Sequence, residues 1–340
     1  MRVFQQIPDE VRAFTGLIDT YIRWKEYQGK DDRQYYKYHP SEWGMCLRKQ
    51  QYKHYQQLGY FPVEWKGHKS TLLRLFDKGH NMHERWSRYF EACGVLRGVW
   101  TCQNKMCKCF DDEGFFDLTK ITETKSTDHS NANGKGRVYG EEELKGVFRP
   151  ERCVCGCTDF KYDEVAVDHE GTNIYGHADL ILDFENFKPE MFKGVSKTFK
   201  KEFFPKKGEV VVGDMKTCSD NVWKSKVMKN QPHSYYLIQL TVYAHILECD
   251  YGLLMYENKN NSELKMFRVD RNEKWWAIIQ EQAHSMIEMK KKKLLPPPRP
   301  DNKSSFECKN CEFKDMCHKS RAWGLPNIDE IRKGWYKEIL

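Results

Sequence analysis

Apolar and polar positions alternate through the middle of the chain with the period of two that is typical of β-strands. The pattern predicts strands near 160–168, 173–184 and 209–217, and two more near 251–257 and 263–269. Between the third and fourth strands, apolar residues recur with helical spacing over about 232–249. This order predicts an α/β fold with a central mixed sheet flanked by helices.

Helical periodicity dominates the first part of the chain and returns near its end. It predicts helices near 8–28, 41–58 and 69–92, the second beginning at Ser41 as its N-cap, and a basic helix near 271–295. We expect four regions, which are a helical region at 1–95, a small insert at 96–160, a core at 161–295 and a C-terminal segment at 296–340.

Two acidic side chains and one lysine fall on the predicted strands. Asp179 lies in the strand near 173–184, and Asp214 and Lys216 lie in the strand near 209–217. Because successive side chains of a strand point to opposite faces, Asp214 and Lys216 share the face of Val210 and Val212. Two carboxylates from neighbouring strands can hold Mg²⁺ or Mn²⁺, while a lysine orients water or stabilises the developing charge. The pattern therefore indicates metal-dependent phosphodiester hydrolysis.

An Asp followed by Asp-x-Lys on a later strand resembles the PD-(D/E)xK nuclease superfamily. Gln239 and Tyr243 are spaced i and i+4 on one face of the next helix, and they resemble the Q-x-x-x-Y motif of the RecB-like branch. Upstream, residues 79–84 resemble the first motif of that branch, in which a histidine is a metal ligand. His83 fits better than His80, because it follows Gly79 by four residues and precedes Glu84.

This resemblance implies a restriction-endonuclease-like core and a set of roles. The catalytic residues would be Asp179, Asp214, Lys216, Gln239 and Tyr243, of which Gln239 and Tyr243 would hold DNA or Lys216 in place. The metal would be bound by His83, Asp179, Asp214 and the backbone carbonyl of Met215.

Four cysteines lie at the two ends of this region. Cys46 precedes the sequence Leu-Arg-Lys, and Cys308, Cys311 and Cys317 follow the prolines at 296–298. The spacing resembles the iron-sulfur RecB-like nucleases, which include the CRISPR-associated RecB-family exonucleases and the AddB nuclease domain. The resemblance implies that these four cysteines hold a 4Fe-4S cluster, for which four thiolates suffice.

Six further cysteines form two short-spaced groups between these ends, which are Cys102, Cys107 and Cys109, and then Cys153, Cys155 and Cys157. Two such groups joined by a loop are the layout of a zinc ribbon, in which four thiolates surround Zn²⁺. We favour the first two cysteines of each group as ligands, with Cys109 and Cys157 as alternates. Disulfides are the other interpretation, but they require an oxidising compartment, and the first residues lack the apolar stretch of a signal peptide.

Charge and composition leave the partner open. The 340 residues carry a net charge of +7, and no apolar stretch approaches the ~20 residues of a membrane helix, so we expect a soluble protein of the cytoplasm, or of the host cytoplasm if a phage encodes it. Seven lysines at 188–207 alternate with phenylalanines. This segment suits a groove for single-stranded nucleic acid, and a solvated loop is an equal alternative.

Taken with the resemblance, these patterns predict a Mg²⁺- or Mn²⁺-dependent deoxyribonuclease that acts as an exonuclease on single-stranded DNA or DNA ends. Recombination, repair, replication and CRISPR spacer processing all fit, with a helicase or a recombination or CRISPR protein as partner. The sequence lacks the phosphate-binding loop of an ATP-driven helicase and the second histidine of a zincin. The alternative is a non-catalytic adaptor that binds DNA ends and uses the iron-sulfur and zinc sites structurally.

Overall fold

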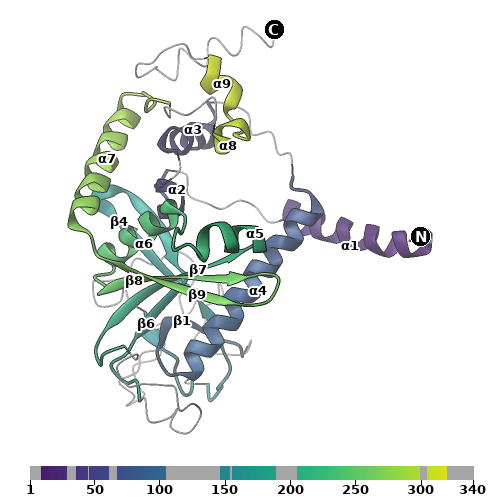
Figure 1. The fold of residues 1–340 in the computed structure, drawn as a ribbon, viewed down its shortest axis with the longest axis vertical. Helices are drawn as coiled ribbons and strands as arrows, with labels where there is room; N and C mark the ends of the chain where they lie inside the picture. The colour runs from purple at the N-terminus through teal and green to yellow at the C-terminus, as the bar shows by residue number, and fades with distance from the viewer. Residues whose placement is uncertain are drawn as a thin grey trace.

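A mixed β-sheet covered by helices on both faces forms the centre of the molecule (Figure 1). The computed structural model describes residues 9–28, 36–44, 46–60, 67–104, 146–153, 155–188, 205–298 and 305–319. The strand order is β2-β1-β6-β7-β8-β9, with β3 paired to β1. The strands are β1 (Leu96–Cys102), β2 (Val147–Phe148), β3 (Phe160–Asp163), β6 (Leu180–Asp183), β7 (Val210–Cys218), β8 (Tyr251–Asn258) and β9 (Leu264–Asp270). The expected α/β fold with a central mixed sheet is confirmed.

The central strands β7 and β8 run parallel, whereas the other pairs in this sheet are antiparallel. A parallel pair requires a crossover connection. Here the chain passes through α5 (Asp220–Val222), the π-helical turn η6 (Trp223–Val227) and α6 (Ser234–Ile246) before it enters β8. Because α6 crosses one face of the sheet, its side chains face the middle of β7.

Each face of the sheet has its own hydrophobic core. Along β7, Val212 packs into the core formed with α6 and α7 (Glu273–Lys291), whereas Val211 and Met215 pack into the core beneath α4 (Ser70–Ala92). The sequence of a strand that is buried on both faces is a continuous run of apolar residues. The run Val210–Gly213 therefore ends, still inside the protein, at Asp214.

A separate two-stranded ribbon consists of β4 (Val165–His169) and β5 (Ile174–Ala178), joined through η3 (Glu170–Thr172). The prediction of continuous strands near 160–168 and 173–184 was wrong, because the first breaks at Glu164 and the second at Asp179. The reason is topological: β3 and β6 belong to the main sheet, whereas β4 and β5 pair with each other. One straight strand cannot follow both sheets.

The predicted helix near 41–58 is two helices, α2 (Pro40–Trp43) and α3 (Leu47–Gln57). Ser41 is not the N-cap, because His39 occupies that position and Pro40 begins the first turn, where its missing N–H is not needed. The break follows Gly44, at which a Cβ atom would lie 2.5 Å from the Cα of Tyr235. The break places Cys46 at the N-cap of α3.

The other two N-terminal helices, α1 (Asp9–Gln28) and α4, agree with the predicted ranges. At the other end of the chain, α8 (Phe306–Lys309) and α9 (Lys314–Lys319) lie beside α3, at the top of Figure 1. The rings of Tyr52 and Phe313 stack with centroids 5.1 Å apart, and Arg48 Nη1 donates to the carbonyl of Pro296 at 2.8 Å. These contacts hold the C-terminal segment against α3. Within the described ranges, no helix has both the length and the apolar character that crossing a membrane requires.

Candidate active site and metal sites

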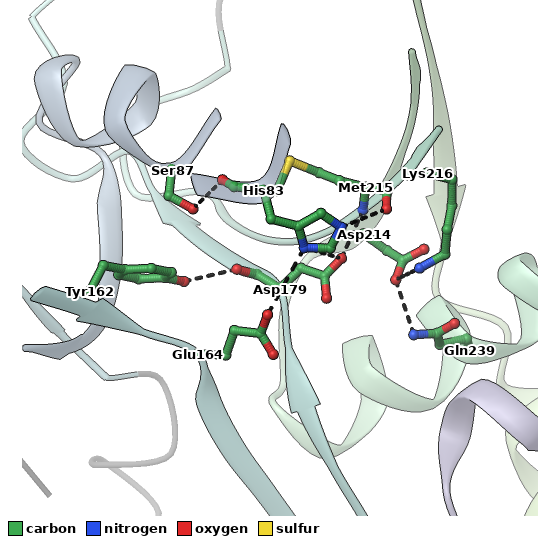
Figure 2. A network of polar contacts seen from close by, with 9 residues as sticks. All are labelled: His83, Ser87, Tyr162, Glu164, Asp179, Asp214, Met215, Lys216 and Gln239. Carbon is green, nitrogen blue, oxygen red and sulfur yellow. Dashed lines mark hydrogen bonds and ion pairs between the residues drawn. The ribbon is translucent and has the colours of Figure 1, made fainter. Parts of the chain in front are cut away.

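Asp214 and Lys216 lie side by side within β7, which continues to Cys218 (Figure 2). Lys216 Nζ donates to Asp214 Oδ1 at 2.7 Å, as their shared strand face predicts. Gln239 of α6 donates from Nε2 to the same oxygen at 3.0 Å. The side chain of Asp214 is only 2% exposed and that of Lys216 19% exposed. The crossover helix therefore delivers Gln239 to a buried carboxylate on β7.

Asp179 and His83 approach the next residue of β7, Met215. Asp179 Oδ2 accepts a hydrogen bond from the amide of Met215 at 3.0 Å, and His83 Nε2 lies 3.1 Å from the carbonyl oxygen of Met215. A carbonyl oxygen can only accept, so this contact places a proton on Nε2, and Nδ1 lies 3.6 Å from Asp179 Oδ2. Of the two histidines considered from the sequence, His83 reaches the group, whereas His80 is an exposed residue of α4.

Glu164 also belongs to this group, and the sequence did not predict it. Its Oε1 lies 3.9 Å from His83 Nδ1, and His83, Glu164 and Asp179 each offer a ligand atom within 4.8 Å of the others. The register of the β4–β5 hairpin is the feature that identifies Glu164 as part of the group. Val165 pairs with Ala178, so the residues one step further out, Glu164 and Asp179, lie opposite each other.

The electrostatics of the group reflect several acids in a small space. Burial and the charge of Asp179 raise the pKa of Glu164 to about 7, against the opposing effect of Lys216. Burial also raises the pKa of Asp214 to about 6, although Lys216 acts to lower it. Burial lowers the pKa of Lys216, but Asp214 and Asp179 outweigh it and the net pKa is raised, so this ammonium stays charged at neutral pH. The single positive charge of Lys216 does not balance the negative charges of the carboxylates of Glu164, Asp179 and Asp214.

The side chains fit a divalent cation. Among the residues that the structure describes, Asp214 Oδ2 is a buried oxygen with no hydrogen-bond partner. Such an oxygen is costly unless a donor or a cation satisfies it. His83, Glu164 and Asp179 offer ligand atoms within 4.8 Å of one another, a group that does not include Asp214, and carboxylate oxygens with a histidine nitrogen are ligands of the kind that Mg²⁺ and Mn²⁺ accept.

Tyr243 lies apart from these charges, in the core beneath α6, where it is 4% exposed. A Cβ atom on Gly176 would lie 2.6 Å from the hydroxyl oxygen of Tyr243 and 3.1 Å from Pro40 Cδ. The glycine therefore permits close approach of Tyr243 and α2 to β5, the strand that leads directly to Asp179.

Three of the insert cysteines come together. Cys102 ends β1, and Cys153 and Cys155 lie on the loop after β2; their sulfur atoms all lie within 4.8 Å of one another, with Cys102 and Cys155 at 3.7 Å. Burial raises the pKa of the Cys102 thiol to about 12. Such a thiol ionises only if a cation compensates its charge, so the trio can hold a metal ion.

Of the other insert cysteines, the structure describes only Cys157. Cys107 and Cys109 lie outside the described residues. The sulfur of Cys157 accepts from the amide of Asp159 at 3.3 Å, and the carbonyl of Cys157 accepts from the amide of Cys153 at 2.8 Å. Cys157 thus shapes the turn that presents Cys153 and Cys155.

The four terminal cysteines also share one neighbourhood. Burial raises the pKa of the Cys46 thiol, a hydrogen bond from the Lys49 amide lowers it, and the nearby thiols of Cys308, Cys311 and Cys317 raise it further. The packing of Phe313 on Tyr52 holds the two segments together. Of the lysine-rich segment at 188–207, residues 189–204 lie outside the described residues, so its role as a groove stays a prediction.

No protein-family model matches the chain, and no curated protein matches it. Among solved structures, it is similar to the protein SSO0001, with a TM-score of 0.40 and 14% identity over 90% of this chain and 96% of that one. It is also similar to an alkaline exonuclease, LHK-Exo, from Laribacter hongkongensis, with a TM-score of 0.27 and 9% identity over 36% of this chain and 53% of that one. For the complex of LHK-Exo with dAMP, the TM-score is 0.26 and the identity 11% over the same shares. At these TM-scores and identities, the similarities decide neither the family nor the activity of this protein.

Proposed function

We propose that this protein is a metal-dependent nuclease that hydrolyses phosphodiester bonds of DNA on a restriction-endonuclease-like core of the RecB-like type. The observation that supports this most strongly is the convergence of Asp179 and His83 on the backbone of Met215, the residue after Asp214 on β7, with Glu164 beside them. An acidic surface patch would not include a buried carboxylate oxygen that lacks a partner.

The metal ligands would be His83, Glu164, Asp179 and Asp214, with the carbonyl of Met215 near them. A bound Mg²⁺ or Mn²⁺ ion lowers the pKa of a water and offsets charge on the scissile phosphate. Lys216, held 2.7 Å from Asp214, would position the attacking water and stabilise the negative charge of the transition state.

Two residues would support this machinery without bonding to the ion. Gln239 donates to Asp214 Oδ1, so it fixes the orientation of that carboxylate and leaves Oδ2 for the cation. Tyr243 packs against Gly176 and would hold β5, and with it Asp179, in place. Both would therefore be positioning residues.

For the substrate, we propose single-stranded DNA or DNA ends and exonuclease action, supported by the RecB-like motifs in the sequence. The pathways would be recombination, repair, replication or CRISPR spacer processing. We also propose two inorganic sites away from the active site. One is a Zn²⁺ ion on Cys102, Cys153 and Cys155, with Cys107 as the fourth ligand, supported by the sulfur distances. The other is a 4Fe-4S cluster on Cys46, Cys308, Cys311 and Cys317, supported by their mutual proximity.

The experiment is a digest of end-labelled single-stranded and double-stranded DNA by the purified protein, with Mg²⁺, Mn²⁺, Ca²⁺ or EDTA. We expect cleavage with Mg²⁺ or Mn²⁺ only and binding with Ca²⁺. Cleavage in excess EDTA would contradict the metal mechanism. Tight binding of DNA ends without cleavage under every metal condition would favour the non-catalytic adaptor.

A further inference from the structure

The ribbon of β4 and β5 has one face in the core and one face turned away from it. Val165 and Val167 of β4, and Ile174 and Ala178 of β5, pack into the core beneath α6. Side chains alternate along a strand, so the opposite face carries the residues between them. Those residues are Glu164 just before β4, Ala166 and Asp168 on β4, Tyr175 and His177 on β5, and Asp179 just after β5.

Two rings follow Asp179 along this outer face. The centroids of Tyr175 and His177 lie 5.3 Å apart with their planes at 84°, and Tyr175 is also edge-on to His39, with centroids 6.3 Å apart. Two residues of a strand span about 6.7 Å, so His177 and then Tyr175 lie at regular steps from the metal-binding carboxylate. His177 is exposed and Tyr175 is half-buried.

The rest of this face leaves the rings accessible and nearly neutral. Ala166 pairs with His177 across the ribbon, and it is the smallest side chain of the face. Asp168, which pairs with Tyr175, forms an ion pair with Lys37 at 2.8 Å. A nucleic acid strand would therefore meet aromatic surface here without an unbalanced carboxylate to repel its phosphates.

We propose that His177 and Tyr175 form a stacking subsite for bases of a single strand whose phosphate lies at the cation that Glu164 and Asp179 would bind. The inference rests on the proposed nuclease function. Stacking on aromatic rings is the usual way in which proteins hold single strands regardless of sequence, because every base offers a π-face. A continuous row of rings that starts two residues from a metal ligand would set the path of the strand into the site. It would also favour single strands over duplexes, whose bases are stacked on each other.

The test compares base stacking with phosphate binding. Binding of a fluorescent single-stranded oligonucleotide, and of the same oligonucleotide with a run of abasic sites, is measured by anisotropy in the Asp214→Asn background to prevent cleavage. His177→Ala combined with Tyr175→Leu is expected to weaken binding of the intact oligonucleotide about 10-fold, and binding of the abasic one by less than about 2-fold. The salt dependence of binding is expected to stay the same, because the phosphate contacts are unchanged.

The conservative pair His177→Phe and Tyr175→Phe keeps the rings and is expected to restore affinity for the intact oligonucleotide. Equal losses on intact and abasic oligonucleotides, or no loss on either, would overturn the subsite, as would a failure of the conservative pair to restore binding. Cleavage by the protein with native Asp214 is assayed in parallel. If base-dependent binding follows the rings but no metal supports cleavage, the proposed nuclease function fails while the subsite stands.

Discussion

The carboxylates of Glu164 and Asp179 lie within 4.8 Å of each other, at the point where the β4–β5 ribbon separates from the main sheet. Each residue occupies the single position between two strands, at the end of the outer face of the ribbon. His83 reaches the same point from α4. The divergence of the two sheets therefore creates the space in which a cation can meet several acids.

The first prediction concerns Lys216. Because its ammonium touches Asp214 at the proposed reaction centre, Lys216→Ala is expected to slow cleavage by at least about 100-fold, while DNA affinity changes by only a few fold. Lys224→Ala is the matched control. Lys224 lies on the adjacent π-helical turn η6 and forms an exposed ion pair with Asp220 of α5. Single-turnover cleavage and anisotropy measure the two effects. Parallel loss of binding and cleavage would mean that Lys216 is a binding residue only.

The second prediction is the pH dependence of metal use. The cation binds deprotonated carboxylates, and the pKa of Glu164 is raised to about 7 and that of Asp214 to about 6. As the pH falls through about 7 and then about 6, protons compete with the metal, so the Mn²⁺ concentration for half-maximal cleavage rises, by up to about tenfold per pH unit for each group. Glu164→Gln is expected to remove the upper step. A metal requirement that does not change between about pH 5 and pH 8 would contradict this account.

The sequence predicts the parts of the site that depend on local periodicity. Alternation along 209–217 placed Asp214 and Lys216 on one face, as the structure has it, whereas helical spacing placed Gln239 only on the same helix face as Tyr243, and its contact with Asp214 comes from the crossover of α6. It did not predict Glu164, although the alternation near 160–168 changes phase there, from Phe160 and Tyr162 to Val165 and Val167, and the two halves join different sheets. Which strand pairs with which is a long-range property, and only the hairpin register reveals that Glu164 faces Asp179.

The same limit explains the helix break before Cys46. Local spacing favours one helix over 41–58, but Gly44 lies against the backbone of Tyr235, which is far away in the sequence. Burial of that contact overrides local propensity. The break then releases Cys46 from the helix and leaves it near Cys308, Cys311 and Cys317.

The third prediction tests the support of β5 by Tyr243. A Cβ atom at Gly176 would lie 2.6 Å from the hydroxyl oxygen of Tyr243, so Gly176→Ala is expected to reduce the free energy of unfolding by about 1–3 kcal/mol. Tyr243→Phe removes that oxygen, and the double variant is expected to recover part of the loss, with Pro40 still close. Gly79→Ala is the control, because open space surrounds that helical position. Strictly additive effects in thermal or urea unfolding would contradict the contact.

The fourth prediction separates the two groups of cysteines. In anaerobically purified protein, Cys155→Ser is expected to remove zinc and leave iron, because Cys155 lies in the insert trio. Cys308→Ser is expected to remove iron and leave zinc. Cys157→Ser serves as the control that retains both, since its sulfur bonds to the Asp159 backbone. Elemental analysis of each variant gives the result, and loss of the same metal from both ligand variants would refute the division.

The most direct test of the central claim is Mn²⁺ binding in the absence of DNA, followed by electron paramagnetic resonance, for the native protein and for Asp179→Asn. The account predicts a bound ion in the native protein and at least about tenfold weaker binding in the variant, with cleavage reduced in the same variant, because Asp179 lies beside His83 and Glu164 and contacts Met215 of β7. Equal Mn²⁺ binding by both proteins would contradict the assignment of this acidic group as the metal site.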